Sequence, residues 1–171
     1  QSSVLLSGSL RKGHELDKNL TGELAKDRQE NNTESFLAKY YYDISDTQEI
    51  SFSYDYFNRS SESDTQSVLG LERFESTTSL LGNDATKRKN LSINYKFVSE
   101  FLWLEGGHIR AYDQKTETSQ LTEEARTSRG KDYLYNRDFF YDQDIQGLRL
   151  NLYTTVESKE VTQLIGYGVE F

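Results

Sequence analysis

The strongest pattern in the chain is an alternation of apolar and polar residues, which is clearest over residues 91–97. Alternate residues of an extended strand point to opposite faces, so this segment separates its apolar from its polar side chains. Its apolar residues are Leu91, Ile93, Tyr95 and Phe97. The pattern recurs along the chain and predicts seven strands, at 4–13, 35–44, 49–59, 89–98, 101–120, 141–156 and 161–171.

The predicted connections between these strands are short and long in turn. Short polar turns are expected at 45–48, 99–100 and 157–160, and long polar loops at 14–34, 60–88 and 121–139. Short turns at one end and long loops at the other are typical of bacterial outer-membrane barrels. We therefore predict an all-β fold, an antiparallel up-and-down transmembrane β-barrel segment of about seven strands of a larger barrel. Residues 1–171 would then be part of a single barrel domain.

Two features of the predicted fifth strand refine this picture. Leu104 and Ile109 fall on opposite faces, so Gly106 and Gly107 are expected to mark a bulge that resets the alternation. Trp103 lies beside the short turn at 99–100 and is expected in the aromatic belt at a membrane surface.

The composition favours a wall in contact with lipid over a compact soluble core. Only 35% of the 171 residues are hydrophobic and the mean hydropathy is -0.79, yet the chain contains 12 Tyr and 9 Phe. Tyrosine suits the interfaces of a membrane barrel. Alternation alone would also fit a soluble β-sandwich with its apolar face inward. The loop asymmetry and the aromatic content favour the membrane.

Charge and residue types exclude several classes of chemistry. The net charge of -8 and the lack of a basic stripe argue against nucleic-acid binding. The chain has no cysteine, so it can form neither a disulfide nor a thiolate metal site. Carboxylates such as Glu123 and Glu124 are plentiful, but no spacing pairs them for catalysis, so we expect no enzyme activity and no metal site.

Residues 133–140, on the return from the predicted third long loop, form the candidate contact surface for a cargo. Tyr, Arg and Phe are the residue types that anchor protein interfaces. The candidates are Tyr133, Tyr135, Arg137, Phe139 and Phe140. An aromatic girdle at the lipid headgroups would use the same residues, so both interpretations stay open. His14, at the start of a predicted outer loop, is a further candidate, whereas His108 is expected to be structural or to face the lumen.

Four segments of the chain resemble the barrel strands of TonB-dependent outer-membrane receptors. They are residues 36–42, 50–58, 88–95 and 109–116. The likeness is one of strand pattern, covers most of the chain, and is greatest to the receptors for haem or haemoglobin and for transferrin or lactoferrin. It implies a protein of the bacterial cell outer membrane that binds haem, or a host haem- or iron-carrying protein, at its extracellular loops and imports the cargo.

The same resemblance implies particular partners and absences. Outer-membrane lipid would contact the wall, and the TonB system would act through parts of the receptor outside this sequence, such as the plug domain and the remaining strands. Haem would be a transported cargo rather than a cofactor bound by this segment, and neither His14 nor His108 matches the family's haem ligands. Two alternatives remain: a small closed outer-membrane barrel (porin, adhesin or structural protein) and a soluble β-domain that binds a ligand.

Overall fold

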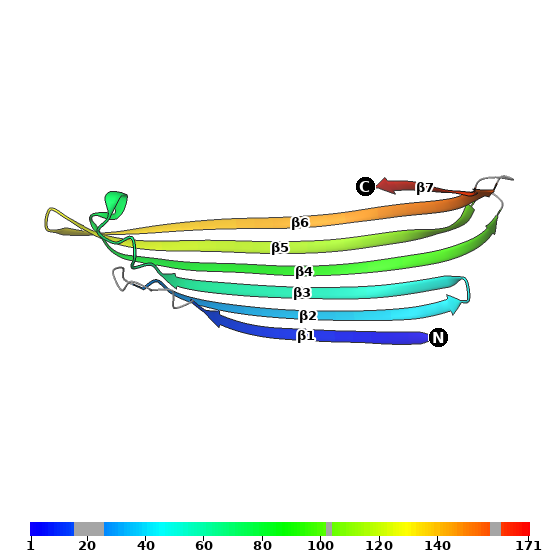
Figure 1. Cartoon of the computed structure of the whole chain (residues 1–171), viewed down its shortest axis with the longest axis horizontal. Helices are drawn as coiled ribbons and strands as arrows, with labels where there is room; N and C mark the ends of the chain where they lie inside the picture. Colours follow the sequence, from blue (N-terminus) through cyan, green and yellow to red (C-terminus); the bar gives the residue numbers. More distant parts are fainter. Residues whose placement is uncertain (16–25, 102–103, 158–161) are drawn as a thin grey trace.

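The computed structural model describes residues 1–15, 26–101, 104–157 and 162–171, whose strands form one antiparallel sheet (Figure 1). The strands pair in sequence order, so each hydrogen-bonds to its neighbours along the chain. They are β1 (Ser2–His14), β2 (Arg28–Ser45), β3 (Gln48–Asp64), β4 (Thr77–Phe101), β5 (Leu104–Ser128), β6 (Lys131–Glu157) and β7 (Thr162–Glu170). A single 3-10 turn, η1 (Glu72–Phe74), is the only helical element of the described residues. The predicted all-β, up-and-down fold is confirmed and is consistent with a segment of a β-barrel.

The strands are longer than predicted and the long loops correspondingly shorter. The loop expected at 60–88 shrinks to 65–76, because β3 continues to Asp64 and β4 begins at Thr77. The loop expected at 121–139 is wrong, since β5 and β6 continue through it and are joined only by Arg129 and Gly130. These extensions mix polar and apolar residues on both faces, so the alternation disappears from the sequence while backbone pairing continues.

The turn expected at 99–100 is wrong, because β4 continues to Phe101, and the irregular region of β5 also differs from the prediction. The turn between β2 and β3 lies where it was expected. The register break lies between Val98 and Phe101 of β4, whereas Gly106 and Gly107 pair in regular register. Those glycines instead allow close packing: a Cβ at Gly106 would lie 2.5 Å from the carbonyl oxygen of Phe97. Trp103 and most of the turn expected at 157–160 lie outside the described residues.

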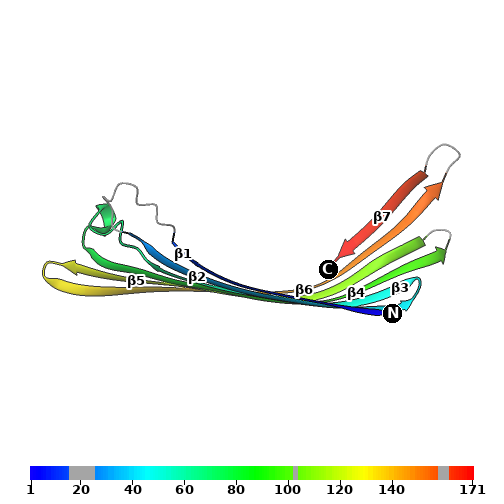
Figure 2. The same ribbon diagram turned by 60° about the horizontal axis from the view of Figure 1, so that its bottom comes forward.

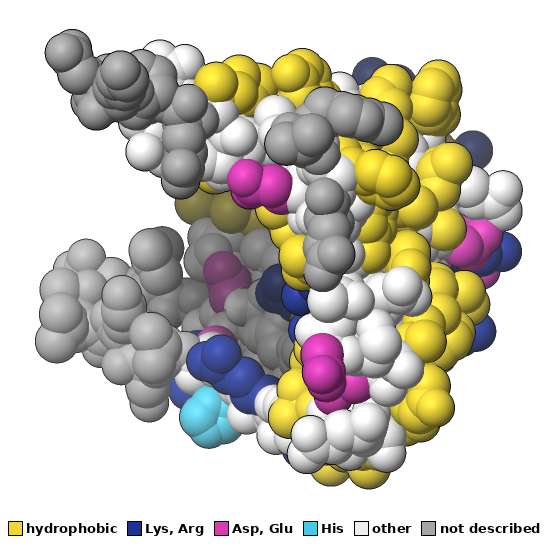
Figure 3. Space-filling view, turned by 90° about the vertical axis from the view of Figure 1, so that its right-hand side faces the viewer, with side chains coloured by type: hydrophobic (Ala, Val, Ile, Leu, Met, Phe, Trp, Pro, Cys, Tyr) yellow, Lys and Arg dark blue, Asp and Glu magenta, His cyan; other side chains and the backbone are white. Residues whose placement is uncertain are grey.

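Strand pairing brings the apolar positions of all seven strands into one continuous band, here called the apolar belt. Directly paired residues share a face of the sheet; one such row runs from Phe52 through Ile93 and Ala111 to Leu148. Seen along the strands, the sheet curves around a hollow, with hydrophobic side chains on the convex surface and many charged ones in the hollow (Figure 3). The main members of the belt are Val4, Leu6, Phe36, Ala38, Tyr40, Tyr42, Ile50, Phe52, Tyr54, Tyr56, Leu91, Ile93, Tyr95, Phe97, Ile109, Ala111, Leu148, Leu150, Leu152, Tyr167 and Val169.

The apolar belt is not covered by a second layer in the described structure. No hydrophobic side chain among the described residues is buried, and Ile93 and Leu148 are 41% and 46% exposed. Tyr95 and Leu150 each pair with Ile109, so they form a row on an open face rather than a packed interior. A soluble sandwich would bury these side chains between two sheets. The hydrophobic face therefore needs an apolar environment that the described chain does not supply.

On the central strands the belt gives way to charged residues close to Leu91, which itself pairs with Asp113 on β5. Outward from Leu91, the next positions on the same face are charged: Lys89 pairs with Lys115, which pairs with Asp144. On β4 the belt covers residues 91–97, about 20 Å between the first and last Cα at the usual rise per residue. Side chains at both ends extend this toward the apolar band of about 25 Å that outer-membrane barrels present to lipid.

The opposite face lines the hollow and is polar. Its hydroxyl and charged groups bond across strands: Ser53 and Ser92 lie 2.7 Å apart at their hydroxyl oxygens, and Arg88 donates to Asp55 at 3.1 Å. Basic side chains outnumber acidic ones on this face, although the whole chain carries a net charge of -8. The basic ones are Arg11, Lys39, Arg59, Arg88, Lys96, Arg110, Arg126, Lys131, Arg137 and Arg149, and the acidic ones Asp43, Glu49, Asp55, Asp84, Glu124 and Glu170.

The described sheet is open at both sides. β1 pairs only with β2, and β7 pairs only with the part of β6 that follows Leu148. The sheet is curved and twisted, and β7 rises away from the plane of the first strands (Figure 2). Right-handed twist of this kind is what bends a sheet toward a barrel wall. Neither edge is paired by another described strand, so the sheet does not close on itself.

Candidate binding surface at the outer end of the sheet

The hairpin formed by β5 and β6 extends furthest at the end of the sheet that we call the outer end, where β1–β2, β3–β4 and β5–β6 are connected (Figure 1). Its two-residue turn, Arg129 and Gly130, has φ values of 53° and 72°. Two successive positive φ values define the turn whose twist matches that of the flanking strands. The strands therefore pair up to Ser128 and Lys131, and the residues around them alternate between the two faces.

Because side chains alternate between the two faces of a strand, the predicted cargo-contact residues fall into two groups. Tyr133, Tyr135, Arg137 and Phe139 are all on the polar face, whereas Phe140 is on the belt face. Their side chains are accessible: Tyr133, Tyr135 and Phe139 are 46%, 42% and 63% exposed. His14 ends β1, pairs with Glu30 and is on the belt face, five strands away from β6. The structure thus brings four candidates together and leaves His14 and Phe140 apart from them.

A buried carboxylate that the sequence did not single out holds this group together. Glu124 of β5 is fully buried and pairs directly with Tyr135. Its Oε1 accepts hydrogen bonds from Arg126 Nε and Thr77 Oγ1, both at 2.7 Å, and its Oε2 accepts one from Arg137 Nη2 at 2.9 Å. The only sequence signal was the spacing of Glu124 and Arg126, two residues apart and so on one face of a strand.

The charge of Glu124 is stabilised by its neighbours. The hydrogen bond from Arg126 is the largest influence and, together with those from Thr77 and Arg137, it outweighs burial and lowers the pKa of Glu124 to about 2. The two arginines together carry one more charge than the carboxylate neutralises. Both remain accessible, with side chains 31% and 47% exposed.

Aromatic rings complete the surface. The Arg126 guanidinium lies 5.1 Å from the centre of the Tyr135 ring, and the Tyr133 and Tyr135 rings stack with centres 6.5 Å apart. A guanidinium over an aromatic face is favourable and restricts both groups. This outer cluster, Glu124, Arg126, Tyr133, Tyr135 and Arg137, therefore presents cationic and aromatic groups in fixed positions. Cationic and aromatic groups are the residue types that anchor protein interfaces.

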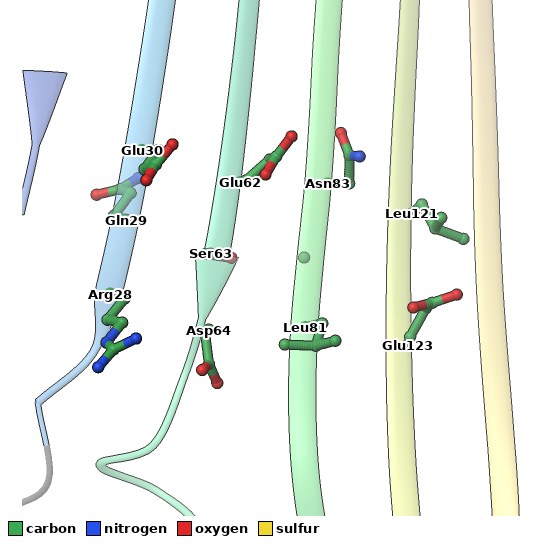
Figure 4. Close-up of a pocket in the computed structure, with 11 residues that line it drawn as sticks. Arg28, Gln29, Glu30, Glu62, Ser63, Asp64, Leu81, Asn83, Leu121 and Glu123 are labelled. Atoms are coloured by element: carbon green, nitrogen blue, oxygen red, sulfur yellow. The ribbon is translucent and has the colours of Figure 1, made fainter. Parts of the chain in front are cut away.

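A shallow groove crosses the outer parts of β2 to β5 (Figure 4). Its side chains lie mainly on the belt face, beyond the belt. Acidic groups dominate it, with Arg28 as its one basic lining residue and Leu81 and Leu121 as its apolar part. Its acidic lining residues are Glu30, Glu62, Asp64 and Glu123. Across the described residues, no group of His, Asp or Glu side chains has the arrangement of a metal site.

A second polar cluster lies in the hollow at the level of the belt. Arg149 of β6 forms a salt bridge with Glu170 at 2.7 Å, and Tyr112 donates to the same carboxylate at 2.9 Å. His108 lies 3.3 Å from Asn94 Oδ1, consistent with the structural, inward-facing position expected for it. Arg110 pairs in register with Arg149.

Neither the protein-family models nor the curated proteins contain a match to this chain. Among the described residues there is no helix of the length and apolar character needed to cross a membrane. The class that the fold defines is an up-and-down antiparallel β-sheet with one apolar and one polar face, consistent with a wall segment of a β-barrel.

Proposed function

We propose that this chain is a wall segment of a bacterial outer-membrane barrel of the TonB-dependent receptor kind, which binds haem or a host haem- or iron-carrying protein and imports it. The observation that carries the membrane part is the exposed apolar belt on the convex face, with charged groups in the hollow. In lipid, the belt would meet hydrocarbon and the polar face would meet water. Open sheet edges do not occur in the hydrocarbon region, so further strands would complete the wall.

The two alternative functions fit these features less well. A small closed barrel requires pairing between the first and last strands, and the described strands form an open sheet. A soluble domain with a ligand in its core requires buried apolar side chains, and the described residues contain none.

Single cysteines test the membrane assignment cleanly, because the natural chain has none. Ile93→Cys and Asn94→Cys are matched, since the residues are adjacent on β4 and point to opposite faces. Each variant, folded into lipid vesicles, would be labelled with an environment-sensitive fluorophore. We expect brominated lipid to quench the label at residue 93 strongly and the label at residue 94 weakly. Equal quenching at the two sites, or a chain that stays soluble and monomeric without detergent, would contradict the proposal.

The cargo part of the proposal places recognition at the outer cluster and rests on the resemblance of the strands to the receptor family. The four candidates on one face, and the fixing of Arg137 by Glu124, support this placement. We expect Tyr133→Ala and Arg137→Ala each to weaken binding of haemin or of a host haem protein about tenfold or more, as anchors of an interface do. Phe140→Ala is the matched control on the opposite face. Unchanged affinity in both cluster variants, measured by Soret titration or surface plasmon resonance, would remove the cluster from recognition.

A further inference from the structure

The outer cluster has hydrogen-bond donors that Glu124 does not use. Arg126 donates to Glu124 through Nε, and Arg137 donates to it through Nη2. A guanidinium carries five N–H donors, and among the described residues these two arginines have no other hydrogen bond or ion pair. Both terminal nitrogens of Arg126, and Nε and Nη1 of Arg137, are therefore available to a ligand.

The cluster also has a surplus of positive charge. Glu124 offsets one of the two guanidinium charges, and Lys131, on the same face of β6, adds a further cation. The β4 residues that pair with this part of β5 are uncharged: Leu80 lies opposite Glu124, and Thr77 lies opposite Arg126. The polar face is therefore cationic here, although the net charge of the chain is -8. Such a surface attracts an anionic ligand.

The burial of Glu124 leaves the arginines open to that ligand. The Glu124 side chain is fully buried, whereas those of Arg126 and Arg137 are 31% and 47% exposed. An anion that arrives from solvent therefore meets the free N–H groups before it meets the carboxylate. The bonds to Glu124 also restrict both guanidinium groups, so less side-chain freedom is lost when a ligand binds them.

Aromatic rings flank these donors on the polar face of β6. Tyr135, Arg137 and Phe139 occupy alternate positions of the strand, about 7 Å apart. Tyr135 and Phe139 are 42% and 63% exposed, and the Tyr135 ring stacks with that of Tyr133. A group bound to Arg137 would therefore have an accessible ring on each side along the strand. Aromatic ligands pair favourably with such rings.

We propose that the outer cluster is a subsite for a carboxylate carried on an aromatic group. The free N–H groups of Arg126 and Arg137 hold the carboxylate, because a guanidinium matches its two oxygens with two parallel hydrogen bonds. Tyr135 and Phe139 contact the aromatic part. This inference rests on the cargo proposal above, which places recognition at the cluster, and it names the chemical group that is recognised. Two kinds of molecule offer that group: a porphyrin with carboxylate side chains, and a polypeptide in which an acidic residue adjoins an aromatic one.

The first test uses the full 171-residue chain folded in detergent micelles, with 5-carboxyfluorescein as an aromatic carboxylate probe. Fluorescence anisotropy would follow displacement of the probe by small competitors. Isophthalate, a ring with two carboxylates, should displace it at about tenfold or more lower concentration than the uncharged isophthalamide. Succinate, which has two carboxylates and no ring, should be about two- to tenfold weaker than isophthalate. Displacement by isophthalamide or by inorganic phosphate as strong as that by isophthalate would overturn the proposal.

Variants then test the arginines themselves. Arg137→Gln should weaken isophthalate binding about tenfold or more, and Arg137→Lys, which keeps the charge and loses the planar group, about threefold or more. Arg59→Gln on β3 is the matched control, because it removes the same charge from the same face at a distance. It should change the affinity less than about twofold. Equal losses in Arg59→Gln and Arg137→Gln, or full affinity in Arg137→Lys, would overturn the proposal. The competitor series on the natural chain decides the matter even where a variant fails to fold.

Two matched pairs of competitors distinguish the sources of the carboxylate. Displacement by an iron-free porphyrin dicarboxylate and not by its dimethyl ester would identify a porphyrin. Displacement by a peptide of alternating Asp and Tyr, and not by its Asn counterpart, would identify a polypeptide. Within both pairs, equal displacement by the acid and its neutral counterpart would overturn the proposal. If isophthalate fails to bind while Tyr133→Ala still weakens haemin binding, the cargo proposal stands without this subsite, and the opposite pair of results would leave the subsite without that cargo.

Discussion

The buried carboxylate of Glu124 allows a quantitative test of the outer cluster, because its protonation should loosen the β5–β6 hairpin. Glu124 lies in the outer extension of β5, beyond the apolar belt. Its hydrogen bonds, first that from Arg126 and then those from Thr77 and Arg137, hold its pKa at about 2, against an ordinary value of 4.5. Because the pKa is lower in the folded state, the ionised carboxylate stabilises the fold above about pH 4.5, and this contribution is lost as the pH falls toward about 2.

The size of the effect follows from the same difference. At about 1.4 kcal/mol for each pH unit, a pKa of about 2 in place of 4.5 corresponds to about 3 kcal/mol. Both arginines are partly exposed, so solvent screening reduces the expected contribution to about 2–3 kcal/mol. This is about a thirty- to one-hundred-and-fiftyfold change in the equilibrium between the closed and open hairpin.

Amide hydrogen exchange in β5 and β6, corrected for the intrinsic exchange rate at each pH, measures that equilibrium locally. We expect the hairpin amides of the natural chain to lose this protection between about pH 5 and pH 2. Glu124→Gln should already be less protected at about pH 6 and should show little further loss on acidification, since the titrating group is gone. Glu123→Gln, which changes the adjacent carboxylate on the opposite face, is the matched control. A pH dependence that persists in Glu124→Gln would refute this account of the cluster.

Three further perturbations test other parts of the structure. Ile93→Lys should destabilise the chain folded in lipid by about 2–4 kcal/mol, because its lysine would face hydrocarbon. Asn94→Lys, on the opposite face, should cost under about 1 kcal/mol. Urea unfolding in vesicles would compare the two variants. Gly147→Ala would place a Cβ 2.5 Å from the Tyr112 hydroxyl and ring, and should displace the tyrosine from Glu170 at a cost of about 1–3 kcal/mol. Gly166→Ala is the control, because a Cβ there, on the same face, has free space. Equal thermal stability of the two variants would count against the contact between Gly147 and Tyr112. Gly130→Ala should lower hairpin stability by about 1 kcal/mol, because its φ of 72° is unfavourable for a residue with a Cβ. Arg129→Gly, at a φ of 53°, should raise hairpin stability by about 1 kcal/mol for the same reason. Amide hydrogen exchange should show less protection in the first variant and more in the second.

The fold was predictable where the two faces of a strand meet different environments. In residues 91–97 each change of face is a change of polarity, and the sequence therefore shows the strand. In the outer half of β6 both faces mix polar and apolar residues, so Asp138 and Phe139 follow each other without a pattern. The periodicity disappears there although the backbone hydrogen bonds do not. The strand ends and the loop at 121–139 were consequently misplaced, while the number, order and direction of the strands were predicted correctly.

The candidate site, too, could be predicted from the sequence only in part. Residue type alone pointed to Tyr133, Tyr135 and Arg137, but the distinction between Phe139 and Phe140 needed the register, which depends on the two-residue turn at Gly130. Once that turn is known, simple alternation places Glu124 beside Tyr135. The carboxylate was overlooked because its role depends on Thr77 and Arg137, which are distant in sequence and belong to two other strands.

The two faces of the sheet differ in where their charged residues lie. On the belt face, charge appears at the outer edge of the apolar band, where Asp113 pairs with Leu91, and beyond it in the row of Lys89, Lys115 and Asp144. On the other face, arginines such as Arg110 and Arg149 lie at the level of the belt itself, where a charge facing hydrocarbon would be expensive. A sheet that places charge at this depth on one face only must have water, or a polar occupant, against that face. The same residues that support the proposed membrane wall therefore also require that its hollow be wet or filled by polar groups.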